Sequence, residues 1–193
     1  MFGVYGDVMY RWSKGIDDSR VRSSEDPQKS ISRETTLYQD TLSRPLLRAL
    51  LYYLSERVAA ELREMDRSAR CVTLKLRYAD FDTITRSRTL KDPTDSHQNI
   101  FQMGQELMER NLGEKGKLVR LIGIGVSNLV GEGRQLGLMS PYSRKQMLLN
   151  RTLDRIRERY GFSAIQTGIT LALRERYPTE AEGYALKTSA LSR

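Results

Sequence analysis

Apolar and polar residues alternate in four segments between positions 29 and 129, and this period-two pattern predicts four strands. In the clearest segment, Cys71–Tyr78, apolar residues at positions 72, 74 and 76 alternate with Thr73, Lys75 and Arg77. Successive side chains of a strand point to opposite sides, so we expect this segment to be half buried. The other predicted strands are Lys29–Leu37, Ile84–Leu90 and Lys117–Leu129.

Two segments between these strands carry apolar residues at three- and four-residue steps, which predicts amphipathic helices. The first begins at Pro45, with Ser43 as its expected N-cap, and its apolar positions are Leu47, Leu50, Leu51, Leu54, Val58 and Leu62. The second begins after Asp95 or Ser96 and ends before Gly113. The order predicts an α+β fold of the split ferredoxin-like βαββαβ type, a four-stranded antiparallel sheet with two helices on one face.

The flanking segments have weaker patterns. Residues 1–17 carry an apolar stripe too short to bury itself, and the polar residues 18–28 read as a linker. The domain itself is expected over residues 29–130, followed by a glycine-containing hinge at 131–142. Residues 143–193 are expected to form a helical extension, with an amphipathic helix over Ser143–Tyr160 and a mobile tail from Glu175. Its inward residues are predicted to be Leu148, Leu149, Leu153 and Ile156.

Charge adds a candidate partner to this picture. The chain has a net charge of +8, and the predicted helices hold many of its acids. The bases in and beside the predicted strands are Arg33, Lys75, Arg77, Arg86, Arg88, Lys117 and Arg120, with Glu34 as the main acid. A sheet face of one sign attracts a partner of the opposite sign, and phosphate backbones are the commonest polyanion. The pattern therefore predicts a nucleic-acid-binding sheet.

The compartment follows from what the sequence lacks. The single cysteine, Cys71, excludes an internal disulfide framework and is typical of a reducing compartment. The sequence has no secretory signal pattern and no apolar run long enough to span a membrane. We therefore expect a cytoplasmic protein that makes no membrane contact.

Three motifs in order resemble one family. The segments Lys29–Thr36 (KSISRETT), Val72–Leu90 (VTLKLRYADFDTITRSRTL) and Val119–Leu129 (VRLIGIGVSNL) resemble the little-finger domain of Y-family DNA polymerases of the DNA polymerase IV (DinB, ImpB/MucB/SamB) type. Gly15–Asp17 looks like the exit of that family's helix–hairpin–helix thumb, so residues 1–17 are expected to be a thumb remnant. The stretch Leu153–Gly168 looks like the C-terminal extension of many members.

The resemblance implies a non-catalytic piece of a bacterial, nucleoid-associated translesion polymerase. In that family the little finger holds primer–template DNA, while the palm, outside this chain, holds the catalytic carboxylates and Mg²⁺. The implied chain has no catalytic residue, metal site or cofactor of its own, and its further partners are the palm, fingers and thumb of the parent enzyme. Its expected DNA-contacting residues are Ser30, Ser32, Arg33, Lys75, Arg77, Thr85, Arg86, Ser87, Arg88 and Arg120.

Guanidinium and hydroxyl groups on an exposed strand suit phosphate oxygens, which position a protein on DNA without reading bases. We expect Arg86 and Arg88 to make the main contacts. Which polar face Lys75 and Arg77 join depends on strand register. Some family members carry further arginines where this chain has Leu121 and Gly125, so the last strand is expected to bind less strongly.

A short peptide after the last predicted strand suggests a second partner. Gln135, Leu136, Leu138 and Met139 look like the glutamine, leucine and two apolar anchors by which bacterial polymerases dock on the sliding clamp. The competing interpretation is a plain apolar link to the next helix.

Other residues are interpreted as structural. Asp80 and Asp82 have the spacing of a metal-binding pair, but they lie in a predicted turn. His97, near a helix start, is expected to cap the helix or face solvent. The alternative function is an RNA-binding module on the same topology, which would need exposed aromatics on the central strands. A third hypothesis is that this chain polymerises DNA itself, but the sequence lacks the clustered carboxylates that this activity needs.

Overall fold

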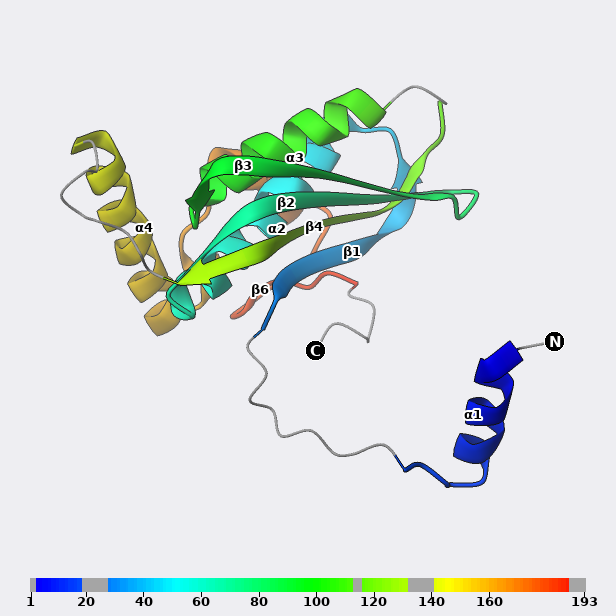
Figure 1. The fold of residues 1–193 in the computed structure, drawn as a ribbon. Coiled ribbons are helices and arrows are strands. Elements are labelled where there is room, and N and C mark those ends of the chain that lie inside the picture. Colours follow the sequence, from blue (N-terminus) through cyan, green and yellow to red (C-terminus); the bar gives the residue numbers. More distant parts are fainter. Residues whose placement is uncertain (1–2, 19–27, 113–115, 132–140, 188–193) are drawn as a thin grey trace.

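The computed structural model describes residues 3–18, 28–112, 116–131 and 141–187. Within it the predicted order of strands and helices is confirmed (Figure 1). The elements are α1 (Gly3–Ser13), β1 (Ser30–Thr41), α2 (Arg44–Glu64), β2 (Arg67–Tyr78), β3 (Thr83–Thr94), α3 (His97–Asn111), β4 (Val119–Gly131) and α4 (Pro141–Tyr160). No helix among the described residues is long and apolar enough to cross a membrane.

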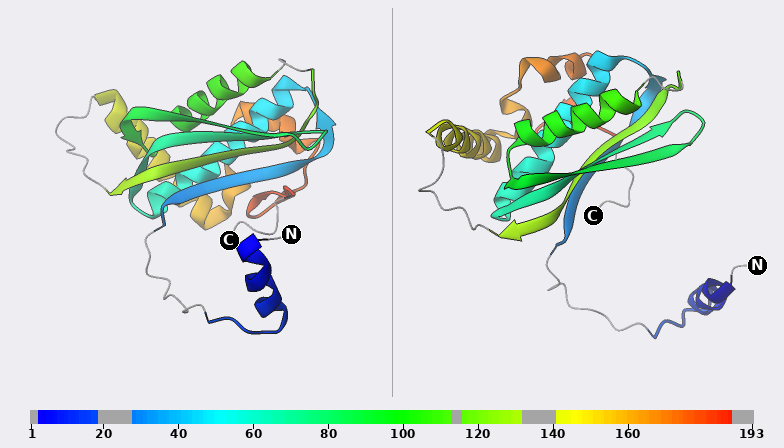
Figure 2. Two further views of the ribbon diagram at one scale, coloured as in Figure 1. Left: turned by 45° about the vertical axis from the view of Figure 1, so that its right-hand side comes forward. Right: turned by 45° about the horizontal axis from the view of Figure 1, so that its top comes forward.

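The four long strands form one antiparallel sheet in the spatial order β1-β4-β2-β3. Strands joined through a helix are never neighbours, because β4 lies between β1 and β2, and β2 lies between β4 and β3. Helices α2 and α3 cover one face, and no helix of the described residues covers the other (Figures 1 and 2). The predicted α+β class with both helices on one face is confirmed.

The strands are longer than the alternation predicts. β2 begins at Arg67 instead of Cys71, because Arg67 pairs with Gly131 and Ala69 with Leu129. β3 continues to Thr94 across a register shift that falls between Ala69 and Cys71 of its partner. Such bulges interrupt the period-two pattern, so the sequence alone underestimates strand length.

Both predicted N-caps have the expected position but not the expected bond. Ser43 precedes α2 with an extended backbone, ψ 98°, and Pro45 lies in the first turn. The Ser43 hydroxyl makes no capping bond among the described residues. Ser96 precedes α3, and its hydroxyl donates to the Gln98 side chain at 2.7 Å.

Helix α2 is buried on more than one side. All six predicted apolar positions are at most 3% exposed, which confirms the leucine stripe that packs on the sheet. Tyr52, Tyr53 and Glu56, on other sides of the helix, are at most 8% exposed. A helix buried around its circumference needs a second layer beyond the sheet.

The C-terminal segment supplies that second layer, so the predicted mobile tail is wrong through residue 187. After α4 the chain forms the short elements η2 (Phe162–Ala164), η3 (Gly168–Thr170), α5 (Leu171–Arg174), β5 (Thr179–Glu180) and β6 (Gly183–Tyr184). Leu173, Tyr177 and Tyr184 are buried. The Tyr184 backbone N–H donates to the Tyr53 hydroxyl at 3.0 Å. The sparse aromatic residues of this tail are what cover α2.

Polar contacts attach α4, and only Leu153 and Ile156 of its four predicted inward residues are partly buried. Leu148 and Leu149 are more than half exposed, which corrects the expectation that they face inward. Arg157 donates to Glu56 at 2.7 Å, and both side chains are almost fully buried. Asp154 accepts two bonds from Arg63, at 2.5 and 2.8 Å. Asp154 and Arg157 belong to the docking face because α2 presents Arg63 and Glu56 there.

His97 is a core residue, which corrects the expectation of a cap or exposed side chain. It is 5% exposed, and its Nε2 lies 3.1 Å from the Tyr52 hydroxyl. Burial, aided by the positive charge of Arg63 and Arg157, lowers the pKa of His97 to about 4. The imidazole is therefore neutral at neutral pH.

The buried Arg157–Glu56 pair gives a test of how α4 is attached. Arg157→Met leaves the Glu56 carboxylate buried without its cation, and we expect the free energy of unfolding to fall by roughly 3–5 kcal/mol in urea denaturation. Burial already raises the pKa of Glu56. Removing Arg157 raises the pKa of Glu56 further, so the Glu56 carboxyl binds a proton more tightly in the folded variant than in the unfolded one. The deficit should therefore shrink as pH falls from 7 towards 5.

Two controls accompany this variant. Arg159→Met, on the exposed side of the same helix, should change stability little. Adding Glu56→Gln to Arg157→Met removes both charges and should recover much of the loss. An equal loss in the single and double variants, with no pH dependence, would show that the Arg157–Glu56 ion pair does not attach α4.

Candidate nucleic-acid interface

The helix-free face of the sheet, called the open face below, is formed by four rows of residues paired across the strands. Residues directly opposite each other in an antiparallel ladder point to the same side. One row runs from Ser32 through Gly125 and Thr73 to Ser87, and the next from Glu34 through Gly123 and Lys75 to Thr85. The flanking rows hold Ser30, Ser127, Cys71 and Thr89 on one side and Thr36, Leu121, Arg77 and Thr83 on the other.

Short bonds between side chains order the centre of the open face. Lys75 Nζ donates to Glu34 Oε2 at 2.7 Å across β4. Arg77 Nε donates to the Thr83 hydroxyl at 3.0 Å, and the hydroxyls of Thr73 and Ser87 lie 2.9 Å apart. The face therefore presents many hydroxyl groups, two cations and one acid. The hydroxyls and the cations can donate to phosphate oxygens without base specificity.

Two glycines of β4 hollow the open face along its middle. Gly123 lies opposite Glu34, and Gly125 opposite Ser32. A Cβ at Gly123 would come 2.7 Å from the Glu34 Cβ, and one at Gly125 would come 3.1 Å from the Ser32 Cβ. The resulting shallow hollow has a volume of about 280 Å³. Its lining on this face includes Ser30, Ser32, Glu34, Thr73, Lys75, Thr85 and Ser127.

Three of the predicted DNA-contacting arginines point to the other side of the sheet. Arg33 pairs in register with buried Ile124, and its guanidinium binds Glu61 of α2 at 2.7 Å. Arg86 and Arg88 pair with buried Leu74 and Val72, so they project on the helix side of edge strand β3. Arg88 forms an ion pair with Glu106 of α3. Of the predicted set, the open face brings together Ser30, Ser32, Lys75, Arg77, Thr85 and Ser87.

Arg120 lies at a β-bulge beside the β2–β3 hairpin. The ladder shifts there, since Leu121 pairs with Arg77 but Val119 pairs with Tyr78. The Arg120 guanidinium lies 4.7 Å from the centroid of the Phe81 ring and 3.4 Å from Asp40. Phe81 is 65% exposed and has φ 66°, a left-handed conformation that costs a non-glycine residue about 1–2 kcal/mol.

The carboxylates of the same hairpin are bound to a lysine. Lys117 forms ion pairs with Asp80 and, at 3.6 Å, with Asp82. The hydrogen bond from Lys117 lowers the pKa of Asp80, and the same bond raises the pKa of Lys117. The described residues contain no group of three or more His, Cys, Asp or Glu that could hold a metal ion. The turn interpretation of Asp80 and Asp82 agrees with this geometry.

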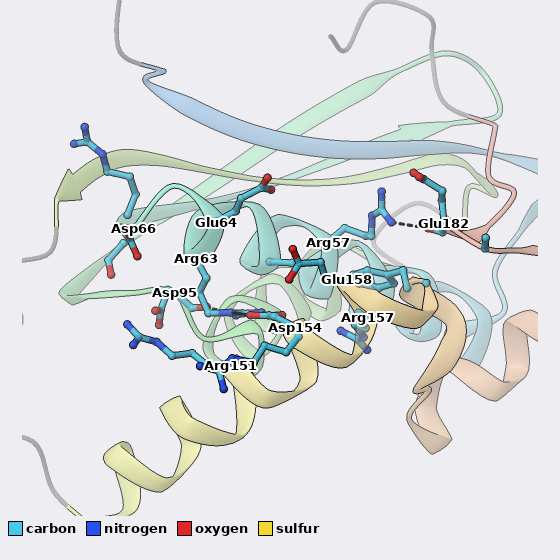
Figure 3. Close-up of a pocket in the computed structure, with 17 residues that line it drawn as sticks. Arg57, Arg63, Glu64, Asp66, Asp95, Arg151, Asp154, Arg157, Glu158 and Glu182 are labelled. Atoms are coloured by element: carbon cyan, nitrogen blue, oxygen red, sulfur yellow. Dashed lines mark hydrogen bonds and ion pairs between the residues drawn. The ribbon is translucent and has the colours of Figure 1, made fainter.

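A larger hollow, of about 590 Å³, lies on the helix side between α2 and α4 (Figure 3). Arginines and acids line it in equal number: Arg57, Arg63, Arg67, Arg151, Arg155 and Arg157 with Glu64, Asp66, Asp95, Asp154, Glu158 and Glu182. Balanced charge does not attract a polyanion. The open face is therefore the better candidate site.

The predicted clamp-docking residues Gln135, Leu136, Leu138 and Met139 lie outside the described residues. The segment that contains them begins directly after β4, which ends at Gly131, and precedes α4, which begins at Pro141.

Comparison with known proteins agrees with the motifs. The model of the impB/mucB/samB family C-terminal domain matches residues 28–138. The chain belongs to this family. It is 40% identical over 175 residues to DNA polymerase IV of Dehalococcoides mccartyi, covering 91% of this chain and 44% of that protein. It is 39% identical over 182 residues to DNA polymerase IV 1 of Mesorhizobium japonicum, covering 93% and 41%.

The chain spans less than half the length of these curated relatives. Among solved structures, DinB from Sulfolobus solfataricus is 15% identical with a TM-score of 0.48, covering 67% of this chain and 36% of that chain. A complex of beta-clamp processivity factor and the little finger domain of PolIV is 23% identical with a TM-score of 0.43, covering 57% and 99%. The family match and the named relatives confirm the resemblance to the Y-family little finger.

Sequence reasoning missed several residues of the open face. Thr73, Thr83, Thr89, Cys71 and Ser127 belong to its rows but were not among the expected contacts. The sequence does contain a signal for these residues, because each lies an even number of positions from Lys75, Thr85 or Gly125 and so shares a strand face with it. Strict use of the two-residue period along β3 would also have separated Thr85 and Ser87 from Arg86 and Arg88.

The close packing of Gly123 against β1 can be tested by a substitution with a matched control. Gly123→Ala forces β1 to shift away from the new Cβ, and we expect the free energy of unfolding to fall by about 1–3 kcal/mol in chemical denaturation. Gly168→Ala is the control, because a Cβ there meets nothing within 4 Å. Equal effects of the two changes would show that close packing at Gly123 is unimportant.

Proposed function

We propose that the open face binds the phosphate backbone of primer–template DNA, and that the chain is the little-finger portion of a translesion DNA polymerase. The proposal places nucleotidyl transfer, and the Mg²⁺ it uses, in parts of the parent enzyme outside this chain. The curated relatives named DNA polymerase IV support the class of enzyme. The coupling to DNA-damage bypass rests on the same likeness.

The arrangement of the open face carries the proposal. A single face of the sheet combines Lys75, Arg77 and rows of serine and threonine hydroxyls around a hollow produced by Gly123 and Gly125. Small side chains allow a phosphate to approach the sheet closely, and hydroxyls can donate to its oxygens. With only two cations on this face, binding should depend on hydrogen bonds as well as on charge. It should also show little sequence preference.

The central strands favour DNA phosphates over stacked RNA bases. RNA-binding sheets usually stack two or three unpaired bases on aromatic side chains of the central strands. On the open face, the central strands β2 and β4, both fully described, carry Cys71, Thr73, Lys75, Arg77, Leu121, Gly123, Gly125 and Ser127. None of these is aromatic, so the RNA-binding alternative lacks its usual platform.

We further propose that Gln135, Leu136, Leu138 and Met139 dock on a sliding clamp. Their pattern and their place between β4 and α4 support this. An extended peptide at that position can present its apolar anchors to a pocket while the open face remains on DNA. One of the similar solved structures holds a little finger domain in complex with a beta-clamp processivity factor. That complex describes the other protein and not this chain.

Replacing the open-face cations tests DNA binding. We expect Lys75→Ala/Arg77→Ala to weaken binding of a labelled primer–template duplex at least tenfold at low salt, on every sequence tried. Losing two phosphate contacts should also reduce the slope of log K against log salt by about 2. Fluorescence anisotropy over a salt series measures both. Glu34→Gln should strengthen binding, because it removes the acid beside Lys75.

The matched control is Arg44→Ala/Arg110→Ala, which removes two exposed cations from the helix side. Equal losses in the two double variants would show that net charge, and not the open face, determines affinity. A loss confined to one DNA sequence would contradict phosphate recognition.

Clamp docking has a separate test. Surface plasmon resonance with an immobilised bacterial sliding clamp should detect binding of the full chain to the clamp. Gln135→Ala/Leu136→Ala should reduce that binding at least tenfold without changing duplex affinity. Unchanged clamp binding would favour the plain-linker interpretation of this segment.

A further inference from the structure

The β2–β3 hairpin ends in a three-residue loop with an unusual residue at its third position. The Tyr78 N–H donates to the Asp82 carbonyl at 2.9 Å, and the Phe81 N–H donates to the Tyr78 carbonyl at 3.0 Å. The loop therefore consists of residues 79–81, and Phe81 has φ 66°. In such loops the left-handed position is normally glycine, or sometimes asparagine. A phenylalanine there works against local backbone preference.

Burial does not compensate for that cost, because Phe81 is 65% exposed. Strained residues that persist without a packing reason tend to lie at binding sites. One contact is made to the ring and one to its backbone. Arg120 lies over the ring at 4.7 Å, and the Thr83 hydroxyl donates to the Phe81 carbonyl at 3.3 Å. The hairpin thus presents an aromatic ring, with a cation beside it, to solvent.

The ring lies at the end of the open face. Arg77 and Thr83 form the first paired row beyond the loop, followed two residues later by Lys75 and Thr85. Lys117 lies at the same tip, bound to Asp80 and Asp82. A DNA strand whose phosphates follow the open-face cations along β2 therefore reaches Phe81 where the sheet ends.

We propose that Phe81, supported by Arg120, stacks an unpaired base of the DNA bound on the open face. Base–aromatic stacking tolerates any sequence and suits a ring with one cationic neighbour. A base inside a duplex is already stacked, so the ring would act on the single-stranded part of a tailed substrate. The inference rests on the proposed function, since it requires DNA on the open face.

The test compares a blunt duplex with the same duplex carrying a single-stranded tail that contains 2-aminopurine. In the full chain we expect the tailed DNA to bind more tightly and the 2-aminopurine fluorescence to change on binding. Phe81→Gly should weaken tailed binding roughly 5- to 30-fold and abolish that change, while leaving blunt-duplex affinity intact. It should leave the melting temperature unchanged or raise it, because glycine favours this backbone.

Two further variants exclude trivial explanations. Phe81→Asn also suits the left-handed position and should reproduce the loss of tailed binding. Tyr160→Ala is the matched control, since Tyr160 is 64% exposed and has Arg159 at 5.3 Å from its ring centroid, but lies on α4. It should behave as the unchanged protein on both DNAs.

Two outcomes overturn the inference. In the first, Phe81→Gly and Phe81→Asn lower the melting temperature and leave tailed binding unchanged, which makes Phe81 a structural residue. In the second, they weaken blunt and tailed DNA equally. Failure of the unchanged protein to bind the blunt duplex would instead refute the proposed function, so the two failures are distinguishable.

Discussion

The burial of α2 between two layers is the constraint on which the rest of the structure depends. Its leucine stripe packs on the sheet, Tyr52 packs against His97 and Phe101 of α3, and Tyr53 packs under the segment that follows α4. Tyr53 contacts Phe162 and Tyr184 edge-on, with ring centroids 5.7 and 5.2 Å apart, and its hydroxyl accepts the Tyr184 N–H. Because α2 and the segment that covers it lie on the same side of the sheet, no helix of the described residues covers the opposite face (Figures 1 and 2).

Charged groups complete this arrangement where apolar contacts are sparse. Glu56 on α2 would be costly to bury alone, and Arg157 of α4 supplies its partner. A buried pair of this kind adds little net stability over an apolar contact, but it specifies which face of α4 docks. That explains why Leu148 and Leu149 remain exposed although the helix is attached.

The open face differs in composition from the helix side of the sheet. Its rows contain hydroxyls, glycines and few charges, and the Lys75–Glu34 bond leaves Arg77 as its main unbalanced cation. A face with this composition cannot form a core, and it suits a hydrated, evenly spaced polyanion. The aromatic ring of Phe81 at its edge is chemically distinct from these rows, which is why a separate role for it is testable.

The sequence by itself determined the order of elements, the half-buried character of β2 and the leucine face of α2, because each depends on a local period of 2 or 3.6 residues. It also identified the family, through motifs that survive in order. Only the tertiary structure decided which of the strand cations are bound to acids of the helices. Arg33 meets Glu61 because α2 crosses that side of β1. The packing of the C-terminal segment was likewise decided by partners distant in sequence, since Tyr184 packs on Tyr53 of α2 and Tyr177 packs on Tyr38 of β1.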